Sequence, residues 1–435
     1  MRCITLPLGL AAFLYINPVF AQTPYPPASE ATALAAQNEP SAALSLEHAM
    51  SLAIEANPEL AIARRELDAV AATREQAAVF RNPEISVDVE DTRSSMRQTT
   101  YWLGQPLELG GKRGARIESA ERARDVASAE LDMRFASVRA AVIQVFYEVL
   151  AAQESLRLAK NSMALANRGL DAARRRVLAG KVSPVEETRA RVAVSGAGIE
   201  LTQASAALEN ARKRLTALWG NPAPRFTEAA GELEILPRLP SLAALYDQLL
   251  NAPEALRARR EVGLREAMLK LEESKRYPDL IVRGGVQRNE MTGERINLIG
   301  LAMTLPIFDR NQGNIYEAKV RVEKARDEQT AVDARLRTDL AQSHRRLAAA
   351  LQTVSDIRKE ILPGAQLALD ATTRGFELGK FGFLDILDAQ RTLFLARGQY
   401  VTALGDVQRA VAEVETILGP QGVSLFTSSR PGYRD

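Results

Sequence analysis

The spacing of apolar residues switches between the period of a strand and the period of a helix. Residues 85–89 alternate apolar and polar side chains, and after a polar turn a second alternating run ends near residue 107. From about 115 to 177 the apolar residues instead recur every three or four positions, without a proline. This pattern predicts a β-hairpin followed by one amphipathic helix, which at 1.5 Å per residue is roughly 95 Å long.

The second half of the chain repeats this order of elements. Asn57-Pro58-Glu59 is echoed by Ala252-Pro253-Glu254 at an offset of 253 − 58 = 195. Leu218-Trp219-Gly220 returns as Ile417-Leu418-Gly419 at an offset of 418 − 219 = 199. Because solenoid repeats have periods of about 20–50 residues, such a long offset predicts a duplicated module.

Each long helix is predicted to end in a tight turn that starts a second helix. Gly180 suits the position after a helix end, where a positive φ is needed. Ser183 fits the N-cap of the next helix, with Pro184 at its first position and Glu186 as the partner in a capping box. Gly379 has the place of Gly180 in the second module, so we expect one helical hairpin per module.

The pattern therefore predicts a mainly α fold with a small β part. Its expected segments are a signal peptide at 1–21, a flexible mature N-terminal tail at 22–45, a first module at 46–220, an inter-module linker at 221–242, a second module at 243–419 and a C-terminal tail at 420–435. The β-hairpins are expected at about 84–108 and 279–306, and the helical hairpins at about 115–218 and 315–418.

Composition and the N-terminal residues predict the compartment of the protein and exclude some classes of partner. Charge is balanced at 56 basic and 54 acidic residues, so no nucleic-acid partner is expected. Arg2, the apolar stretch 6–16 and the small residue Ala21 predict a cleaved signal peptide, with an uncleaved anchor helix as the alternative. Cys3 precedes the apolar stretch, so we expect neither a lipid at the cleavage point nor a disulfide. No run of about 18 apolar residues follows, and no transmembrane helix is expected.

No residue pattern predicts catalysis, a cofactor or a metal site. His48 and His344 are far apart and are interpreted as packing residues, because metal sites need clustered ligands. Residues 110–112 lack the spacing of a phosphate-binding loop. The basic run 174–176 is interpreted as a solvated helix face. We therefore predict that the protein is not an enzyme and binds no cofactor.

Four long strands are too few to close a membrane barrel, which has at least about eight. An open sheet edge in lipid leaves backbone groups unpaired, so membrane insertion would require several chains to share one barrel. Three chains would supply 3 × 4 = 12 strands, whereas the eight of a dimer would be filled by side chains. The alternative is a small soluble β-subdomain on a helical rod. Tyr101 and Trp102 fit either an interfacial aromatic belt or ordinary strand packing.

Three motifs occur in order within the duplicated frame. Residues 105–113 read QPLELGGKR, residues 305–313 read LPIFDRNQG, and residues 383–390 read FLDILDAQ after Gly379. These motifs resemble those of the TolC-like outer membrane factors of Gram-negative tripartite pumps, especially the branch serving heavy-metal (cobalt-zinc-cadmium type) RND efflux. The resemblance covers residues from about 45 to 419.

The resemblance implies a homotrimer in the outer membrane of a Gram-negative bacterium, extending into the periplasm. Its TolC-like fold would join a trimeric α-helical barrel to a shared 12-stranded β-barrel in outer membrane lipid. The implied partners are a periplasmic adaptor (membrane fusion) protein and an inner membrane RND pump. The channel would passively conduct its substrate outward, and divalent heavy-metal cations are the expected cargo. Alternatives are a conduit for organic solutes or secreted protein, or a non-channel periplasmic coiled-coil adaptor.

The resemblance also implies roles for residues at the periplasmic tip. The positions that match the adaptor-docking tip turns are Gly180, Lys181, Ser183, Pro184, Gly379, Lys380 and Gly382.

A second set matches the periplasmic constriction. Asp385 and Asp388 match its acidic positions, while Glu186 and Arg189 occupy the equivalent positions of the first module. The two aspartates are three residues apart and share a helix face. The simpler interpretation is that acids suit a helix N-terminus. We hypothesise that Asp388 and Arg189 of a neighbouring helix help to hold the tip closed.

Overall fold

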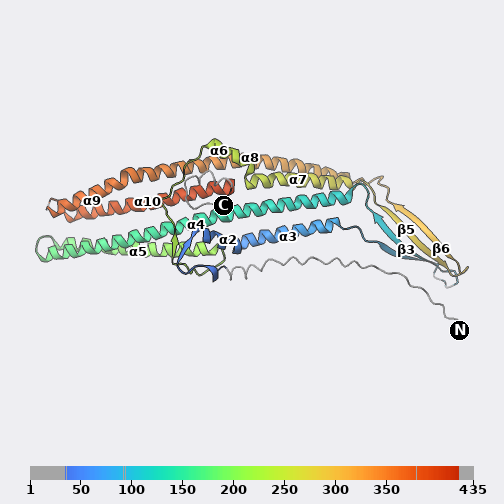
Figure 1. Cartoon of the computed structure of the whole chain (residues 1–435), viewed down its shortest axis with the longest axis horizontal. Helices are drawn as coiled ribbons and strands as arrows, with labels where there is room; N and C mark the ends of the chain where they lie inside the picture. The colour runs from blue at the N-terminus through green and yellow to red at the C-terminus, as the bar shows by residue number, and fades with distance from the viewer. Residues whose placement is uncertain (1–34, 36, 92, 94, 379, 421–435) are drawn as a thin grey trace, which may run out of the picture.

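A computed structural model describes residues 35, 37–91, 93, 95–378 and 380–420. The predicted signal peptide, residues 22–34 and 36 of the predicted tail, Gly379, and residues 421–435 of the predicted C-terminal tail lie outside the described residues. The described chain forms a long body of helices with a β-sheet at one end (Figure 1).

Helices account for most of this body, which confirms the mainly α fold class. The first half contains α2 (Leu46–Ala56), α3 (Pro58–Ala78), α4 (Lys112–Leu178) and α5 (Pro184–Ala217). The second half contains α6 (Leu242–Gln248), α7 (Pro253–Ser274), α8 (Gln312–Asp356), α9 (Leu362–Glu377) and α10 (Phe383–Leu418). With 67 residues, α4 is about 100 Å long.

The helices pack lengthwise against one another, and the sheet continues from one end of them (Figure 1). Helix α3 packs on α4, α4 on α7, and α7 on α8. Toward the other end of the body, α4 packs on α5 and on α10, and α10 packs on α8 and α9. The two helical hairpins α4–α5 and α9–α10 therefore run side by side to the end farthest from the sheet (Figure 1).

Pro363 interrupts the long helix of the second module, where the structure has a π-helical turn. Helix α8 passes into a π-helical segment, Ile357–Ile361, and then into α9, where Pro363 is the second residue. Proline has no N–H, and its ring clashes with the carbonyl four residues earlier. A wider turn before the proline relieves this clash and allows the helix to continue.

The sheet contains both predicted hairpins. Strands β2 (Glu84–Glu90) and β3 (Gln98–Leu107) form the first hairpin, and β5 (Leu280–Asn289) and β6 (Arg295–Met303) form the second. All pairs are antiparallel, in the order β2-β3-β5-β6, with Trp102 opposite Gly285. Strands β2 and β6 are the edges, and neither has an outer partner among the described residues.

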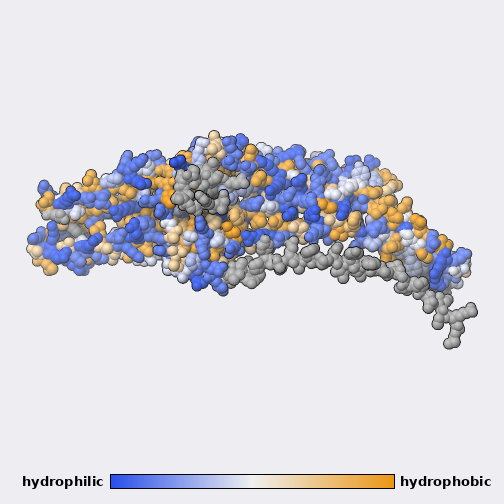
Figure 2. Space-filling view, viewed as in Figure 1, coloured by the Kyte–Doolittle hydropathy of each residue, from blue (hydrophilic) through white to orange (hydrophobic). Residues whose placement is uncertain are grey.

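The two faces of the sheet differ in polarity. One face is mainly apolar and exposed, with Arg288, Arg295 and Asn297 toward the β5–β6 turn, and Ile299 on it is 89% exposed. Its apolar members are Ile85, Val87, Val89, Tyr101, Leu103, Val282, Val286, Ile299, Leu301 and Met303. The opposite face carries Glu84, Asp88, Glu90, Gln98, Trp102, Arg283 and Gln287, together with the apolar Ile281, Ile296 and Leu298. Figure 2 shows apolar side chains gathered over the sheet end of the molecule.

The alternation of side chains settles the placement of the aromatic pair. Successive residues of a strand point to opposite faces. Tyr101 lies on the apolar face, where an interfacial belt would be, whereas Trp102 lies on the polar face. The interpretation that Trp102 belongs to a lipid-facing belt is therefore wrong.

Part of the predicted flexible tail is an ordered strap. Strand β1 (Ala43–Ser45) pairs in parallel with β4 (Glu228–Ala230), which lies in the predicted linker. Glu39 is only 3% exposed and accepts four hydrogen bonds from residues 219–226. Phe226 of the linker is fully buried. The expectation of a loose tail is therefore wrong for residues 39–45, because their partners lie about 180 residues away in the sequence.

Two large clusters of buried side chains form most of the core among the described residues. The first joins the strap and linker to α2, α4 and α5 around Trp219 and Phe146, and the second joins α6, α8 and α10 around Leu340 and Leu347. Helix α4 contains an 18-residue window with mean hydropathy 1.5, so it is long and apolar enough to cross a membrane. Half of that window is buried in the body, as in a core helix.

Candidate functional site

The first tip turn has the geometry that its sequence predicts. Gly180 has φ of 68°, a left-handed conformation that glycine adopts without strain. The Lys181 N–H donates to the Arg176 carbonyl, and the Gly180 N–H donates to the Val177 carbonyl, both at 2.9 Å. These two bonds make a Schellman motif, which ends α4 and satisfies its last carbonyls.

Helix α5 then begins at the predicted cap, although not with the predicted capping box. Ser183 Oγ accepts a hydrogen bond from the Val185 N–H at 3.3 Å, and Pro184 is the first helical residue. The Glu186 N–H donates to the Ser183 carbonyl instead of to its hydroxyl. In the hydrogen bonds of the described residues, the Glu186 carboxylate does not return to the Ser183 N–H. The reciprocal box was therefore wrong, and the Glu186 carboxylate has no hydrogen-bond or ion-pair partner in the described part of the chain.

The second tip turn repeats the first where it is described. The Lys380 N–H donates to the Gly375 carbonyl at 2.7 Å, as the equivalent Lys181 N–H does to Arg176. The ring of Phe381 lies directly on Gly375, because a Cβ added there would be 2.0 Å from Phe381 Cδ2. Gly379, the remaining predicted docking residue, lies outside the described residues.

Asp385 and Asp388 have different local roles. The Asp385 carboxylate accepts a hydrogen bond from the Gly382 N–H at 2.7 Å, so it caps the first turn of α10. Glycine has no side chain, and this bond is therefore only half of a capping box. Asp388 is exposed and has no hydrogen bond or ion pair among the described residues. The simpler interpretation of a helix-terminal acid fits Asp385, whereas Asp388 is free to act elsewhere.

Asp388 and Arg189 line the same groove between the two helical hairpins. The groove has a volume of about 700 Å³ and includes Val192, Leu387 and Phe394 on its walls. Both charged residues are exposed. Within the described part of the chain, no ion pair joins them. One protomer thus brings the two predicted constriction residues to one groove without pairing them.

Two contacts at the tip were not predicted. Glu187 accepts hydrogen bonds from Arg174 of α4 at 3.2 Å and from Arg191 of α5 at 2.9 Å, and so ties the arms of the first hairpin together. The guanidinium of Arg176 stacks 3.7 Å from the centroid of the Phe376 ring in α9. The interpretation of 174–176 as a merely solvated face is therefore wrong for two of its arginines.

The motif at 105–113 anchors the sheet to the helices. Lys112 Nζ lies 2.5 Å from Asp279 Oδ1, which links the first module to the second. Arg116 contacts both carboxylate oxygens of Glu108, at 2.5 and 3.1 Å. The Arg116 hydrogen bonds hold the pKa of Glu108, whose side chain is 7% exposed, below its ordinary value.

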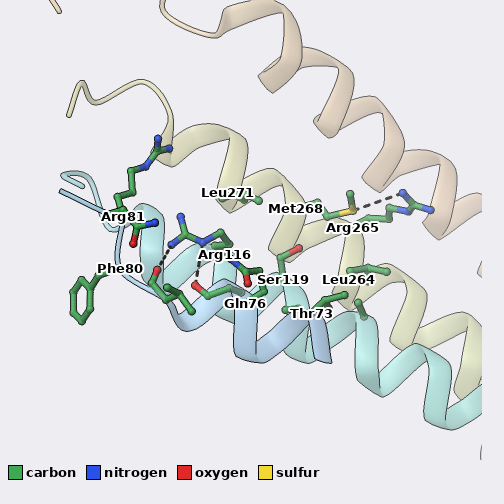
Figure 3. A pocket seen from close by; sticks show the side chains of 15 residues that line it. Thr73, Gln76, Phe80, Arg81, Arg116, Ser119, Leu264, Arg265, Met268 and Leu271 are labelled. Carbon is green, nitrogen blue, oxygen red and sulfur yellow. Dashed lines mark hydrogen bonds between the residues drawn. The ribbon is translucent and has the colours of Figure 1, made fainter. Parts of the chain in front are cut away.

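A hollow of about 760 Å³ lies beside this junction (Figure 3). Arg116 enters it from α4 and donates to the carbonyls of Ala77 and Val79 at 3.0 and 3.2 Å. Its other walls are Phe80 and residues of α7 such as Met268. Because the Arg116 guanidinium already donates four hydrogen bonds to Ala77, Val79 and Glu108, we interpret its role as structural anchoring.

The histidines also have structural partners. His48 Nε2 lies 3.2 Å from the Asn38 carbonyl, and His344 Nε2 lies 2.9 Å from the Pro240 carbonyl. Among the described residues, no group of three His, Cys, Asp or Glu side chains is arranged to hold a metal ion.

The fold and the duplicated frame agree with one protein family. The profile of the family described as "Outer membrane efflux protein" matches residues 49–221 and 244–420, one match for each half of the chain. The chain belongs to the outer membrane efflux protein family. It is therefore an efflux protein rather than an enzyme, and it lies in the outer membrane and extends into the periplasm.

Relatives of this efflux protein are named for metal resistance. It is 44% identical to the cobalt-zinc-cadmium resistance protein CzcC of Cupriavidus metallidurans, over 96% of this chain and all of that one. It is 30% identical to the nickel and cobalt resistance protein CnrC of the same organism, over 64% of this chain and 67% of that one.

Solved structures show the same fold. The MtrE outer membrane channel of Neisseria gonorrhoeae, solved in its open state, has a TM-score of 0.73 at 19% identity, covering 89% of this chain and 91% of its own. CusC has a TM-score of 0.74 at 16% identity, covering 86% of this chain and 92% of its own. The TolC-like fold class is thereby confirmed.

Proposed function

We propose that this efflux protein is the outer membrane conduit of a tripartite pump. Three copies would join their four-stranded sheets edge to edge, β2 of one protomer beside β6 of the next, into a barrel of 3 × 4 = 12 strands. The helical modules would form a tube through the periplasm. The far tip would dock on a periplasmic adaptor, and an inner membrane RND pump would supply the energy.

The observation that carries this proposal is the sheet with two free edges and one exposed apolar face. Each unpaired backbone group costs several kcal/mol in hydrocarbon, so such a sheet is stable in a bilayer only when its edges are paired. The apolar face suits contact with outer membrane lipid, and the polar face suits a water-filled lumen. A barrel of twelve strands is also wider than the eight-stranded barrels that side chains fill.

We infer that the cargo is divalent heavy-metal cations, most simply cobalt, zinc or cadmium. The support is the full-length likeness to a cobalt-zinc-cadmium resistance protein. The test is growth of a deletion strain in graded concentrations of each metal, with a bile salt and a dye as organic controls. Metal sensitivity that the wild-type gene reverses supports the inference. Sensitivity to the organic compounds alone would instead favour the conduit for organic solutes.

We propose that Asp388 and Arg189, with Asp385 and Glu186, form the periplasmic constriction. Three copies of exposed Asp388 would raise the local cation concentration in a narrow pore. Asp388→Asn should change single-channel conductance or open probability without changing thermal stability. Asp385→Ala is the comparison, because it removes the acceptor of the Gly382 N–H at the start of α10 and should lower stability by about 1 kcal/mol. An Asp388→Asn channel that behaves as wild type would remove Asp388 from this role.

We propose that the two tip turns dock the adaptor. Their exposed members, Lys181 and Lys380, project from equivalent turns. A photo-crosslinking amino acid at position 181 should capture the adaptor in cells, whereas the same group at exposed Lys324, in the body of α8, should not. Equal capture at both positions would contradict docking at the tip.

A further inference from the structure

A tryptophan and an arginine lie flat on the polar face of the sheet. Trp102 of β3 and Arg283 of β5 share this face, and the Arg283 guanidinium carbon is 5.3 Å from the Trp102 ring centroid. This distance is within the range of a cation–π interaction. The face is opposite the exposed apolar face, so in the proposed barrel both side chains line the lumen.

Three glycines on adjacent strands make room for the pair. A Cβ at Gly285 would be 2.6 Å from Trp102 Cε3, and one at Gly104 would be 3.3 Å from Arg283 Cγ. A Cβ at Gly300 would lie 3.7 Å from the indole ring and 3.8 Å from Arg283 Nε. The three positions thus form a trough across β3, β5 and β6. The indole and the guanidinium lie along the wall instead of projecting into the pore.

The charge of Arg283 is not neutralised by a carboxylate. Among the described residues, Arg283 forms no ion pair, and its buried Nε has no hydrogen-bond partner. Strand β2 presents three exposed carboxylates on the same face, those of Glu84, Asp88 and Glu90. Glu84 pairs with Gly104, and Gly104 pairs with Arg283, so only a glycine separates the acid from the arginine in one row across the sheet.

We propose that Arg283, held against the wall by Trp102, is a lumenal selectivity residue that limits how tightly the barrel retains cations. This inference rests on the proposed trimeric conduit, in which each protomer contributes one Arg283 and three β2 carboxylates. Conduction requires that an ion bind well enough to enter but weakly enough to leave. A fixed positive charge in the row of Glu84 opposes the trapping of a divalent cation by the acids.

The position of Trp102 explains why the positive charge does not block the pore. A free arginine side chain would extend into the lumen, where it would both narrow the path and repel the incoming cation. The cation–π contact and the glycine trough hold the guanidinium at the perimeter. The positive charge therefore weakly repels cations from the edge of the lumen without obstructing their path.

The test is planar-bilayer recording of the purified protein with Arg283→Gln, Arg283→Lys and Arg288→Gln. Arg288 is the matched control, because it lies on the same strand but on the opposite face, where it pairs with Glu290 at 3.1 Å. One unit charge at about 8 Å in water changes the local ion concentration about two- to threefold. Removing the charge raises the local cation concentration and lowers the local anion concentration by that factor each, so we expect Arg283→Gln to raise the cation-to-anion permeability ratio about sixfold.

The same recordings give a second readout with zinc. The Zn²⁺ concentration that half-blocks the potassium current should fall about sixfold in Arg283→Gln, because the energy of a divalent cation in the same field is twice as large. Arg283→Lys keeps the charge and should stay near wild type, as should Arg288→Gln. Equal permeability ratios and zinc block in Arg283→Gln and Arg288→Gln would overturn the inference. If the wild-type protein itself conducts no current, the proposed conduit fails instead.

Discussion

The buried carboxylate of Glu39 offers a quantitative test of how the chain is held together. Glu39 Oε2 accepts from Trp219 Nε1 at 3.2 Å and Asn221 Nδ2 at 2.7 Å. Glu39 Oε1 accepts from the backbone N–H groups of Arg225 and Phe226, at 2.6 and 3.1 Å. These bonds fasten the N-terminal strap to the segment between the modules, and Trp219 is fully buried beside them.

The variant Glu39→Gln keeps the shape of the side chain but replaces one acceptor oxygen with an NH₂ group. Two of the four donors then face another donor and lose their partner. Each buried donor left unsatisfied costs about 1–3 kcal/mol, and because the two are neighbours we expect a loss of about 3 kcal/mol. A helical body of roughly 330 residues has an unfolding entropy of about 0.7 kcal/mol/K, so the melting temperature should fall by about 4 °C.

Trp219 itself reports on the contact. The chain has two tryptophans, so a Trp102→Phe background leaves Trp219 as the only one. Thermal unfolding of detergent-solubilised protein at one scan rate should show the lower melting temperature and a red-shifted Trp219 emission in Glu39→Gln. Exposed Glu55 in α2 is the control, and Glu55→Gln should change stability by less than about 0.5 kcal/mol. Equal melting curves and emission for Glu39→Gln and Glu55→Gln would refute the reasoning.

Three further predictions concern the turns and junctions. Gly180→Ala places a Cβ on a residue with φ of 68°, and it should lower the free energy of unfolding by about 1–2 kcal/mol, measured by thermal unfolding. Gly196, in the middle of α5, has open space around it, so Gly196→Ala should be neutral or stabilising. Glu108→Gln should cost about 1–3 kcal/mol at pH 7. Because the pKa of Glu108 is lowered in the folded protein, its ionised carboxylate stabilises the fold above the ordinary pKa of 4.5, and this stabilisation is lost as the pH falls through the folded-state pKa. Wild type should therefore lose more stability on acidification than Glu108→Gln does. Phe376→Leu removes the ring beneath Arg176 and should weaken the contact between the hairpins by about 0.5–2 kcal/mol. The loss should be measurable as faster hydrogen exchange at the end of α9. Unchanged exchange would count against that contact.

Local signals in the sequence were sufficient for the elements and the tip turns. The change of period predicted both hairpins and the long helices, and the glycine at 180 and the serine at 183 predicted a turn whose geometry follows from backbone sterics. The sequence also allows the prediction that Tyr101 and Trp102 face opposite sides of the sheet, because neighbouring residues of a strand point to opposite faces.

The remaining features depend on partners that are distant in the sequence. Glu39 looked like part of a loose tail because its donors begin 180 residues later. Arg176 looked solvated because Phe376 lies in the other module. Asp385 was expected to act at a pore, but in the structure its carboxylate accepts a hydrogen bond from the Gly382 N–H at the start of α10. Pairing of this kind follows from packing and not from local pattern.

The central claim is that one chain supplies one third of a closed pore wall, and intermolecular cross-linking between β2 and β6 tests it most directly. The chain has one cysteine, at position 3 in the predicted signal peptide, so introduced cysteines report cleanly. Cysteine at Ser86 of β2 would be combined in turn with cysteine at Ile296, Leu298 or Gly300 of β6, all on the polar face. The account predicts that oxidation in membranes gives a covalent trimer and nothing larger for at least one pair. A ladder extending beyond three chains, or no cross-link at any of the three registers, would contradict it.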